Sequence, residues 1–294
     1  VTANIAAGTA AALKSALAGV SNDNTDVLDL TVTGTTAAAA DLKALDAKTF
    51  KDVNATAISK LTGNIADVKA VISGGIDLGA NVSIDVSGTV SVADANLIDD
   101  TNGVVTATIE TGTVAALNAL SDGNVNAYKL TVSDTTIDAA DLNTLDGKTS
   151  VAVNAAAIKN IDGAGATGAA NVKAAYLANA KKDISGLGNE TVDLSKAGDA
   201  NAALVKAIND YTTGLITLPT ITFDKAAVAG TTFDLKQLGD LNGITGLVNI
   251  DAKNTQDDTI SISLKDLLAA NDSKGNFTFK VTGDNGGNDE VSIT

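Results

Sequence analysis

Residues 130–161 read LTVSDTTIDAADLNTLDGKTSVAVNAAAIKNI, and residues 30–61 read LTVTGTTAAAADLKALDAKTFKDVNATAISKL. Leu30 matches Leu130, and the Asp-Leu and Val-Asn pairs within the stretch keep the same offset of 100 residues. Self-similarity at a fixed period is the signature of a repeat architecture, in which each unit must stack on its neighbours to bury its apolar faces. The 294-residue chain therefore favours a solenoid over one or two ordinary globular domains.

The similarity extends toward the start of the chain with a changed offset. VTANIAAGTAAALKSAL at 1–17 aligns with VTATIETGTVAALNAL at 105–120, which is an offset of 104 residues. The four-residue difference falls in the loop SNDNTD at 21–26, where an insertion costs little free energy. Loop lengths thus vary between the copies while the expected strands keep their positions.

Alternation of apolar and polar residues predicts half-buried strands at 28–32, 82–86, 128–132 and 191–195. The residues that would share the buried face are Leu28, Leu30, Val32, Ile84, Val86, Leu130, Val132, Val192 and Leu194. After each of the first three strands comes a short amphipathic helix, expected at 39–46, 92–99 and 139–146. Asp138 is expected to cap the last of these helices.

A second strand (51–55, 104–109 or 150–155) and a second helical stripe complete the expected unit. Ile58 with Leu61, and Ile158 with Ile161, have helical spacing that later apolar residues extend. We expect units of about 50 residues, each reading strand, short helix, strand, helix. The predicted fold class is mainly β with short helices: a parallel β-solenoid with right-handed connections and a β-rich C-terminal segment.

Three regions follow from this pattern. Residues 1–186 form the repeat solenoid, with units near 27–80, 82–125 and 127–180. Residues 187–244 form a divergent repeat, with an edge or interrupted strand at 215–224 around the chain's only proline, Pro219. Residues 245–294 are expected to form a separate β-rich module, whose calcium type is implied by the resemblance given below.

Composition limits the chemistry. The chain has 20 basic residues, all lysine, against 35 acidic ones, for a net charge of −15, so nucleic acid is a poor partner and divalent cations are better ones. It has no His, Cys, Met or Trp, which removes the commonest general base, thiol chemistry and soft-metal ligation. No apolar run approaches the length of a membrane span, so no membrane insertion is expected. Because Val1 is neither an initiator Met nor the start of a signal peptide, the sequence reads as an excised or processed piece.

The tail GLVNIDAKNTQDDTISISLKDLLAANDSKGNFTFKVTGDNGGNDEVSIT at 246–294 resembles the β-rich segments of large calcium-binding surface proteins that Gram-negative bacteria export by type I secretion. The DAADLNTLDGKTSVAVNA units are similar to repeats of S-layer and giant adhesin proteins of the same export class, related to the RTX proteins. The resemblance implies extended, often calcium-stiffened structures on the cell surface. The nonapeptide calcium motif of that group is present only as a fragment at 286–291, without tandem copies.

Oxygen-rich loops are the candidate Ca²⁺ sites, because Ca²⁺ takes six to eight carboxylate, amide and carbonyl oxygens from flexible loops. The candidate ligands are Asp284, Asn285, Asn288, Asp289 and Glu290 in GDNGGNDE; Asp257 and Asp258 in NTQDD; Asp23 and Asp26 in SNDNTD; and Asp99 and Asp100 in IDDTN. Hairpin turns and solvated acidic loops would explain the same residues without an ion.

Two other recurring features favour structural roles. Asn54 and Asn154 follow the second strand, where a side-chain amide typically satisfies neighbouring backbone groups. The Asp–Lys pairs in LDAKT (45–49) and LDGKT (145–149) are interpreted as exposed residues that aid solubility, with an assembly contact as the alternative.

These observations predict a non-enzymatic, extracellular structural protein of an S-layer-like assembly, stabilised by Ca²⁺. Its expected partners are copies of itself and a cell-surface polysaccharide. The stalk of a type I secreted adhesin is the alternative. A polysaccharide-cleaving β-helix enzyme is a second alternative, although the chain has few aromatic residues to bind sugars and no Arg or His to bind uronates.

Overall fold

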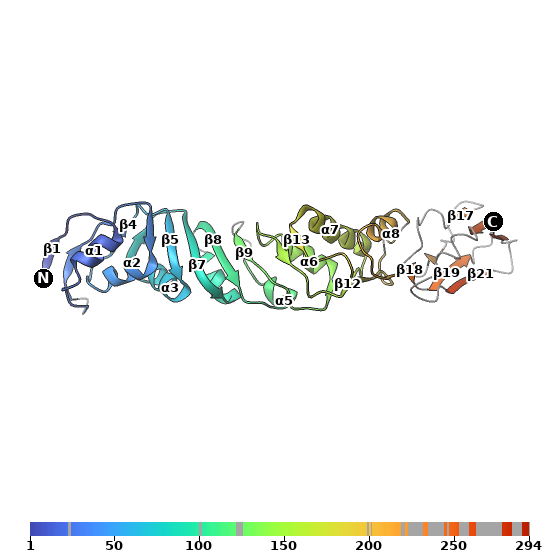
Figure 1. Cartoon of the computed structure of the whole chain (residues 1–294), viewed down its shortest axis with the longest axis horizontal. Helices are drawn as coiled ribbons and strands as arrows, with labels where there is room; N and C mark the ends of the chain where they lie inside the picture. Colours follow the sequence, from blue (N-terminus) through green and yellow to red (C-terminus); the bar gives the residue numbers. More distant parts are fainter. Residues whose placement is uncertain are drawn as a thin grey trace. The chain divides into compact units, whose positions relative to one another are not determined.

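The computed structural model describes residues 1–22, 25–99, 102–121, 126–198, 200 and 202–218, together with the backbone of seven strands beyond residue 220. These residues form eight helices and several parallel sheets, so the chain is mixed α/β where the sequence predicted mainly β (Figure 1). The helices are α1 Ala10–Ala16, α2 Ala39–Asp46, α3 Ile65–Ser73, α4 Val92–Asp99, α5 Val114–Leu117, α6 Ala139–Asp146, α7 Gly168–Lys181 and α8 Ala202–Asn209.

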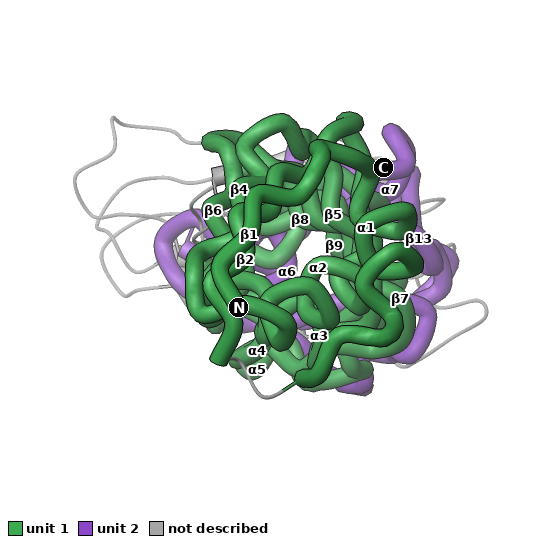
Figure 2. Tube along the Cα trace, turned by 90° about the vertical axis from the view of Figure 1, so that its left-hand side faces the viewer, with its two compact units in different colours: residues 1–131, 145–154 green, residues 132–144, 155–294 purple. Residues whose placement is uncertain are grey.

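The chain divides into two compact units, which Figure 2 colours separately. Unit 1 comprises residues 1–131 and 145–154. Its strands are β1 Thr2–Asn4, β2 Val27–Asp29, β3 Thr36–Ala38, β4 Val53–Ala55, β5 Lys60–Asn64, β6 Ile76–Leu78, β7 Val82–Val90, β8 Asn102–Ile109, β9 Ala127–Lys129 and β11 Val153–Asn154. Its largest sheet has the order β3-β5-β7-β8-β9, and β1-β2 and β4-β6 form two-stranded sheets.

Unit 2 comprises residues 132–144 and 155–294. Its strands are β10 Thr136–Asp138, β12 Asn160–Asp162, β13 Ile184–Ser185, β14 Thr191–Asp193, β15 Ile216–Thr217, β16 Ile221–Thr222, β17 Thr232–Asp234, β18 Ile244–Thr245, β19 Leu247–Ala252, β20 Thr259–Ile262, β21 Thr278–Gly283 and β22 Glu290–Ile293. Its sheets have the orders β10-β12-β14-β15-β18, β16-β19-β21 and β17-β20-β22. The strand expected at 215–224 is interrupted, because β15 and β16 replace it.

Consecutive strands of the large sheets pair in parallel. In unit 1, Thr36 pairs with Lys60, and Lys60 pairs in turn with Ser83. In unit 2, Thr136 pairs with Asn160, and Asn160 pairs with Thr191. In unit 1, the distance in sequence between paired residues is therefore about half the length of the predicted unit. The reason is that each half of the predicted unit contributes its own strand to the same sheet.

The predicted short helices are confirmed: α2, α4 and α6 occupy 39–46, 92–99 and 139–146. The buried face predicted from strand alternation is also confirmed. Each of its members is at most 6% exposed: Leu28, Leu30, Val32, Ile84, Val86, Leu130, Val132, Val192 and Leu194. The core is made largely of aliphatic residues such as these, which suits thin, closely stacked layers.

The second helical stripe was placed wrongly at its start. Leu61 lies in β5 and Ile161 in β12, while the helices that follow begin at Ile65 and Gly168. Ile58 is buried just before the strand, in a turn where its amide donates to the carbonyl of Ala55. An apolar turn residue three positions before a strand residue imitates helical spacing, which explains the error.

Polar side chains hold the turns between these elements. Thr9 and Thr113, which occupy equivalent positions, accept hydrogen bonds from the amides of Ala12 and Ala116 and cap α1 and α5. The predicted cap of α6 is confirmed, because the carboxylate of Asp138 accepts from the amide of Ala140 at 2.7 Å.

The predicted turn role of Asn54 is confirmed. Its side-chain oxygen accepts from the amide of Thr56 at 3.2 Å and from the Thr56 hydroxyl at 2.8 Å. This is the local pairing expected of an asparagine at the end of a strand.

The assignment of the Asp–Lys pairs to the exposed surface is wrong for Lys48. This lysine is 8% exposed, and its Nζ donates a hydrogen bond to the carbonyl of Val20, in the turn after α1. Lys148 repeats the contact with the carbonyl of Leu120 at 2.9 Å. Each lysine thus has a structural role, because its ammonium group joins two segments that are distant in the sequence. The spacing of residues in the sequence does not show which carbonyl accepts this hydrogen bond.

Candidate functional site

Most of the predicted calcium ligands lie outside the described residues: Asp23, Asp100, Asp257, Asp258, Asp284, Asn285, Asn288 and Asp289. Glu290 begins β22, and its side chain also lies outside the described part. The structure places two of the predicted ligands, Asp26 and Asp99. Calcium binding at the other positions stays a prediction.

Asp26 lies before β2, with its carboxylate against the amino group of Val1. Its carbonyl accepts from the amide of Phe50 at 2.7 Å. Both contacts join Asp26 to other segments of unit 1.

Asp99 ends α4 and is only 4% exposed. Its Oδ1 accepts from Asn126 Nδ2 at 2.6 Å, and its Oδ2 accepts from the hydroxyl of Ser121. Asn126 is fully buried, and its Oδ1 accepts from the amide of Val105 at 2.8 Å. Because both carboxylate oxygens accept hydrogen bonds inside the fold, Asp99 is positioned to anchor α4 to the neighbouring turns.

Tyr128 lies beside this network. Burial raises the pKa of its hydroxyl, and the negative charge of Asp99 raises it further. Among the described atoms the hydroxyl has no hydrogen-bond partner. The phenol therefore stays protonated at physiological pH and contributes mainly apolar packing.

Unit 2 contains an aspartate column that the sequence analysis missed. Asp138, Asp162 and Asp193 are in register on the adjacent parallel strands β10, β12 and β14. Burial raises the pKa of Asp162, and so do the neighbouring charges of Asp193 and Asp138, while Lys196 lowers it. The signal was present in the sequence, because each strand is a tripeptide that ends in Asp: TID, NID and TVD.

The aspartate column has a local structural role. Asp138 caps α6, and Asp193 accepts from the amide of Ser195 at 2.8 Å. Adjacent strands are about 4.8 Å apart, so three in-register carboxylates form a line and do not surround one point. In the part of the chain that the structure describes, no group of three or more His, Cys, Asp or Glu side chains is arranged to hold a metal ion.

Unit 1 carries a Lys–Asp ladder across four successive helices. Lys14 of α1 pairs with Asp41 of α2 at 2.8 Å, Lys43 of α2 with Asp67 of α3 at 2.7 Å, and Lys69 of α3 with Asp94 of α4 at 2.6 Å. Each aspartate lies in the first turn of its helix, where the helix dipole favours a negative charge. Each of the helices α2, α3 and α4 thus pairs its aspartate with a lysine of the preceding helix, and each of α1, α2 and α3 contributes a lysine to the next.

The Lys–Asp ladder also lowers pKa values. The hydrogen bond from Lys43 lowers the pKa of Asp67, with a second contribution from Asn64, and the hydrogen bond from Lys69 lowers the pKa of Asp94. A sequence signal exists in the Asp-x-Lys spacing of α2 and α3. Residues two apart do not face each other on one helix, so each charge must find its partner on a neighbouring helix.

A second buried carboxylate belongs to unit 2. Glu190 is fully buried, and its Oε2 accepts from the amide of Gly188 at 2.7 Å and from the hydroxyl of Tyr176 at 3.2 Å. The ring of Tyr176 stacks on that of Tyr211 with centroids 6.2 Å apart. These contacts order the turn before β14. The same contacts place the carboxylate of Glu190 next to the phenol of Tyr176. The hydroxyl of Thr212 donates a hydrogen bond to the backbone carbonyl of Glu190 at 2.9 Å.

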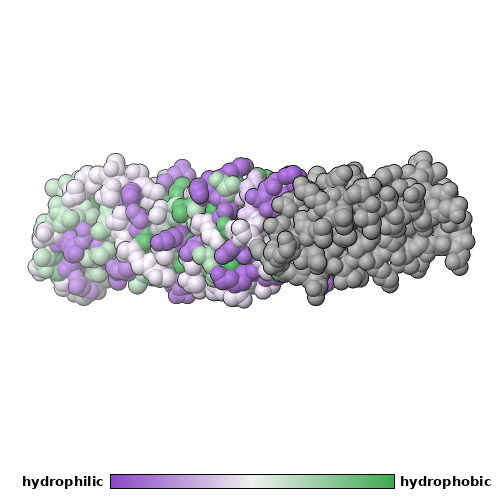
Figure 3. All heavy atoms as spheres, turned by 45° about the vertical axis from the view of Figure 1, so that its right-hand side comes forward, coloured by the Kyte–Doolittle hydropathy of each residue, from purple (hydrophilic) through white to green (hydrophobic). Residues whose placement is uncertain are grey.

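The exposed surface is mixed in character. Figure 3 shows hydrophilic and hydrophobic residues interspersed over the coloured part of the face it displays, without a broad apolar area there. None of the described helices is both long enough and apolar enough to cross a membrane.

A scan against protein-family models gave no match, and searches of curated proteins and of solved structures gave none either.

Proposed function

We propose that this protein is a non-enzymatic structural component of a bacterial extracellular surface assembly of the S-layer kind, built as a parallel β-solenoid. The observation that carries the proposal is the repeated parallel pairing of consecutive strands, seen where Thr36 pairs with Lys60 and Lys60 with Ser83. A chain that adds one helix and a further strand to the same sheet at each step lengthens without needing a larger core.

The Lys–Asp ladder supports the same proposal. Its three pairs join helices that are consecutive in the sequence, so each pair fixes one step of the repeat to the next. Exposed pairs of this kind contribute little stability individually. Their regular geometry instead favours one stacking register, which a stiff structural element requires.

Calcium is the proposed stabilising ion, with copies of the chain and a cell-surface polysaccharide as partners. The net charge of −15 makes neighbouring copies repel one another, and a divalent cation bound between acidic groups would reduce that repulsion. The acidic loops at 254–258 and 283–290 are the proposed sources of ligands, because Ca²⁺ takes carboxylate, amide and carbonyl oxygens from flexible loops. The resemblance to calcium-binding surface proteins is the reason for proposing calcium.

Electron microscopy of the purified chain tests this proposal. We expect ordered sheets or filaments at millimolar Ca²⁺, and dispersed particles after chelation. A matched sample with NaCl at the same ionic strength separates specific binding from general charge screening. If the chain stays monomeric with and without Ca²⁺, the assembly proposal fails in favour of an adhesin stalk.

A further inference from the structure

The strand β6 is an open edge within unit 1. It pairs in parallel with β4, with Val53 opposite Ile76, and the described chain offers no third strand to this sheet. The next passage of the chain runs from the end of α4 at Asp99 to the start of β8 at Asn102. Neither of these two elements is paired with β6.

The backbone of β6 has groups available for another strand. The amide of Val53 donates to the carbonyl of Gly75 at 2.7 Å, so Gly75 and, two residues on, Asp77 direct their peptide groups toward β4. In a parallel ladder the alternate residues, Ile76 and Leu78, direct theirs to the opposite edge. An unpaired row of N–H and C=O groups is a template for an added strand.

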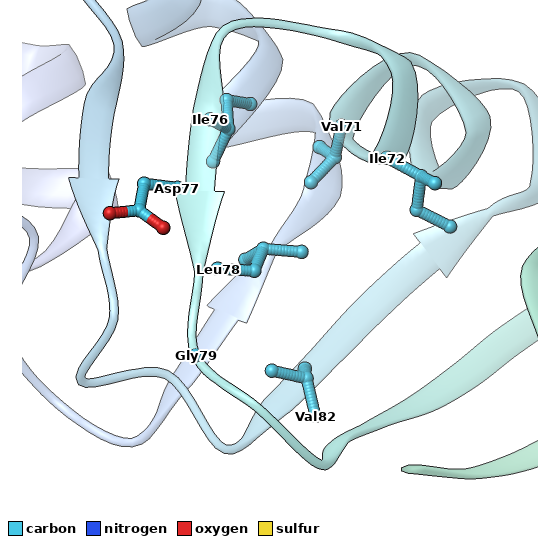
Figure 4. Close-up of a pocket in the computed structure, with 7 residues that line it drawn as sticks. All are labelled: Val71, Ile72, Ile76, Asp77, Leu78, Gly79 and Val82. Carbon is cyan, nitrogen blue, oxygen red and sulfur yellow. The ribbon is translucent and has the colours of Figure 1, made fainter. Parts of the chain in front are cut away.

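A hollow of about 310 Å³ lies beside this edge, and we name it the apolar hollow for the five aliphatic side chains in its lining (Figure 4). These side chains belong to Val71 and Ile72 of α3, Ile76 and Leu78 of β6, and Val82 of β7, and the lining is completed by Asp77 and Gly79. Val71 and Val82 are buried, whereas Ile76 and Leu78 are only partly covered. The hollow is large enough for one aliphatic side chain.

An acidic hollow of about 410 Å³ adjoins the apolar one, and both share Ile76 and Asp77. Asp52 and Asp77 line it, and Asp46 lies behind Gly75. Burial raises the pKa of Asp46, and the charge of Asp52 raises it further. Among the described residues, none of these three aspartates forms a salt bridge with a lysine.

We propose that the open edge of β6 binds an extended segment of a partner polypeptide that carries a lysine next to an aliphatic residue. Successive side chains of a strand point to opposite faces, so one would enter the apolar hollow and its neighbour would reach the acidic hollow. The charge of the occupant follows from complementarity with Asp46, Asp52 and Asp77. This proposal does not depend on surface assembly or on calcium.

Fluorescence anisotropy of the full chain in chelator, with a fluorescein-labelled peptide of alternating valine and lysine, tests the proposal. We expect saturable binding that weakens about tenfold when glutamate replaces lysine in the peptide. N-methylation of the peptide backbone removes the donors of an added strand and should abolish binding. Absence of saturable binding, or equal binding of the N-methylated peptide, would overturn the proposal.

The double variant Asp52→Asn/Asp77→Asn locates the site. It should weaken peptide binding by about tenfold, whereas Asp85→Asn, which changes an acid on β7 that pairs with Lys60, should leave binding unchanged. Urea denaturation of each variant checks that it folds. Equal weakening by Asp85→Asn would overturn the assignment to β6. If the double variant abolished self-association in sedimentation and left peptide binding unchanged, the occupant would be a second copy and the proposal would be wrong.

Discussion

Residues 30–61 and 130–161 fold alike in the hydrogen bonds that hold their turns. Thr35 and Thr135 each accept two amide hydrogen bonds at their carbonyls, from residues 59 and 60 and from residues 159 and 160. Thr49 donates its hydroxyl to the carbonyl of Leu28 at 2.9 Å, and Thr149 donates to that of Tyr128 at 2.7 Å. The hydrogen bonds that hold the turns are thus the same in both copies.

The two copies differ in their exposed electrostatics. Lys43 pairs with the carboxylate of Asp67, whereas Asn143 donates to the backbone carbonyl of Asn171 at 2.9 Å. Asp138 caps α6, but α2 follows Ala38, which provides no side-chain cap. Contacts that a buried peptide group requires are therefore retained, and contacts between solvated groups are replaced, because replacing them costs little free energy.

The largest test of the equivalence uses the cores of the two copies. Leu42→Ala and Leu142→Ala each remove a fully buried side chain from corresponding helices, and each should lower the free energy of unfolding by about 2–5 kcal/mol. Urea denaturation followed by circular dichroism measures both. As a control, Leu97→Ala on α4, where the leucine is 49% exposed, should change it by about 0.5 kcal/mol or less. A near-zero effect at one copy only would contradict equivalent packing.

Thr49→Val should lower the free energy of unfolding by about 1–3 kcal/mol, because it leaves the amide and carbonyl of buried Leu28 without their partner. Thr49→Ser keeps the hydroxyl and is the matched control. Thr149→Val should have a similar but smaller effect, since Thr149 is less buried. Denaturant titration checks the order, and a stabilised Thr49→Val protein would contradict the role of the hydroxyl.

Asp162→Asn should raise the free energy of unfolding at neutral pH by about 0.5 kcal/mol, the size of a cross-strand like-charge pair. The pKa of Asp162 is raised in the folded state by burial and by its acidic neighbours. The favourable contribution of Asp162 to the free energy of unfolding is therefore fully present below pH 3.8, its ordinary pKa, where the side chain is protonated. It is lost as pH rises through the raised pKa and the side chain becomes charged. Thermal melts from pH 3 to 7 should show the gain of the variant growing with pH, and a gain that is constant with pH would be inconsistent with this origin.

Lys43→Asn, which gives the first copy the residue of the second, should have the smallest effect. It should lower stability slightly at low salt and less at about 1 M NaCl, where exposed pairs are screened. Because Lys43 lowers the pKa of Asp67, the ion pair should stabilise the fold fully above pH 3.8 and lose its effect as pH falls through the lowered pKa. The difference in stability between the variant and the original chain should therefore shrink over the same range of pH. Melting curves at two salt concentrations measure this, and a loss that salt does not reduce would exclude an electrostatic cause.

Local features of this fold could be predicted from the sequence. The helices at 39–46, 92–99 and 139–146 have the predicted bounds, because apolar spacing and adjacent turns define them locally. Strands in the tail, such as β19 and β21, also fall within predicted β-rich segments.

The aspartate column and the Lys–Asp ladder were missed, because both depend on which strand or helix lies beside which. That register follows from the length of chain between paired strands, which differs from one turn to the next. The chain between the paired residues Ile84 and Val105 is shorter and includes α4. The chain between the paired residues Asn160 and Thr191 is longer and includes α7. Alternation of apolar and polar residues within a strand does not specify these lengths.

The Lys–Asp ladder has a consequence for how such a chain can change length during evolution. Each lysine reaches forward to the aspartate of the next helix, so all the pairs run in one direction. Deleting the complete repeat step β3-α2-β4 would remove Asp41 and Lys43 together and place Lys14 next to Asp67. Gain or loss of a complete repeat step by recombination therefore leaves no charge in the ladder unmatched, whereas a deletion that removed only Asp41 or only Lys43 would leave one charge without its partner.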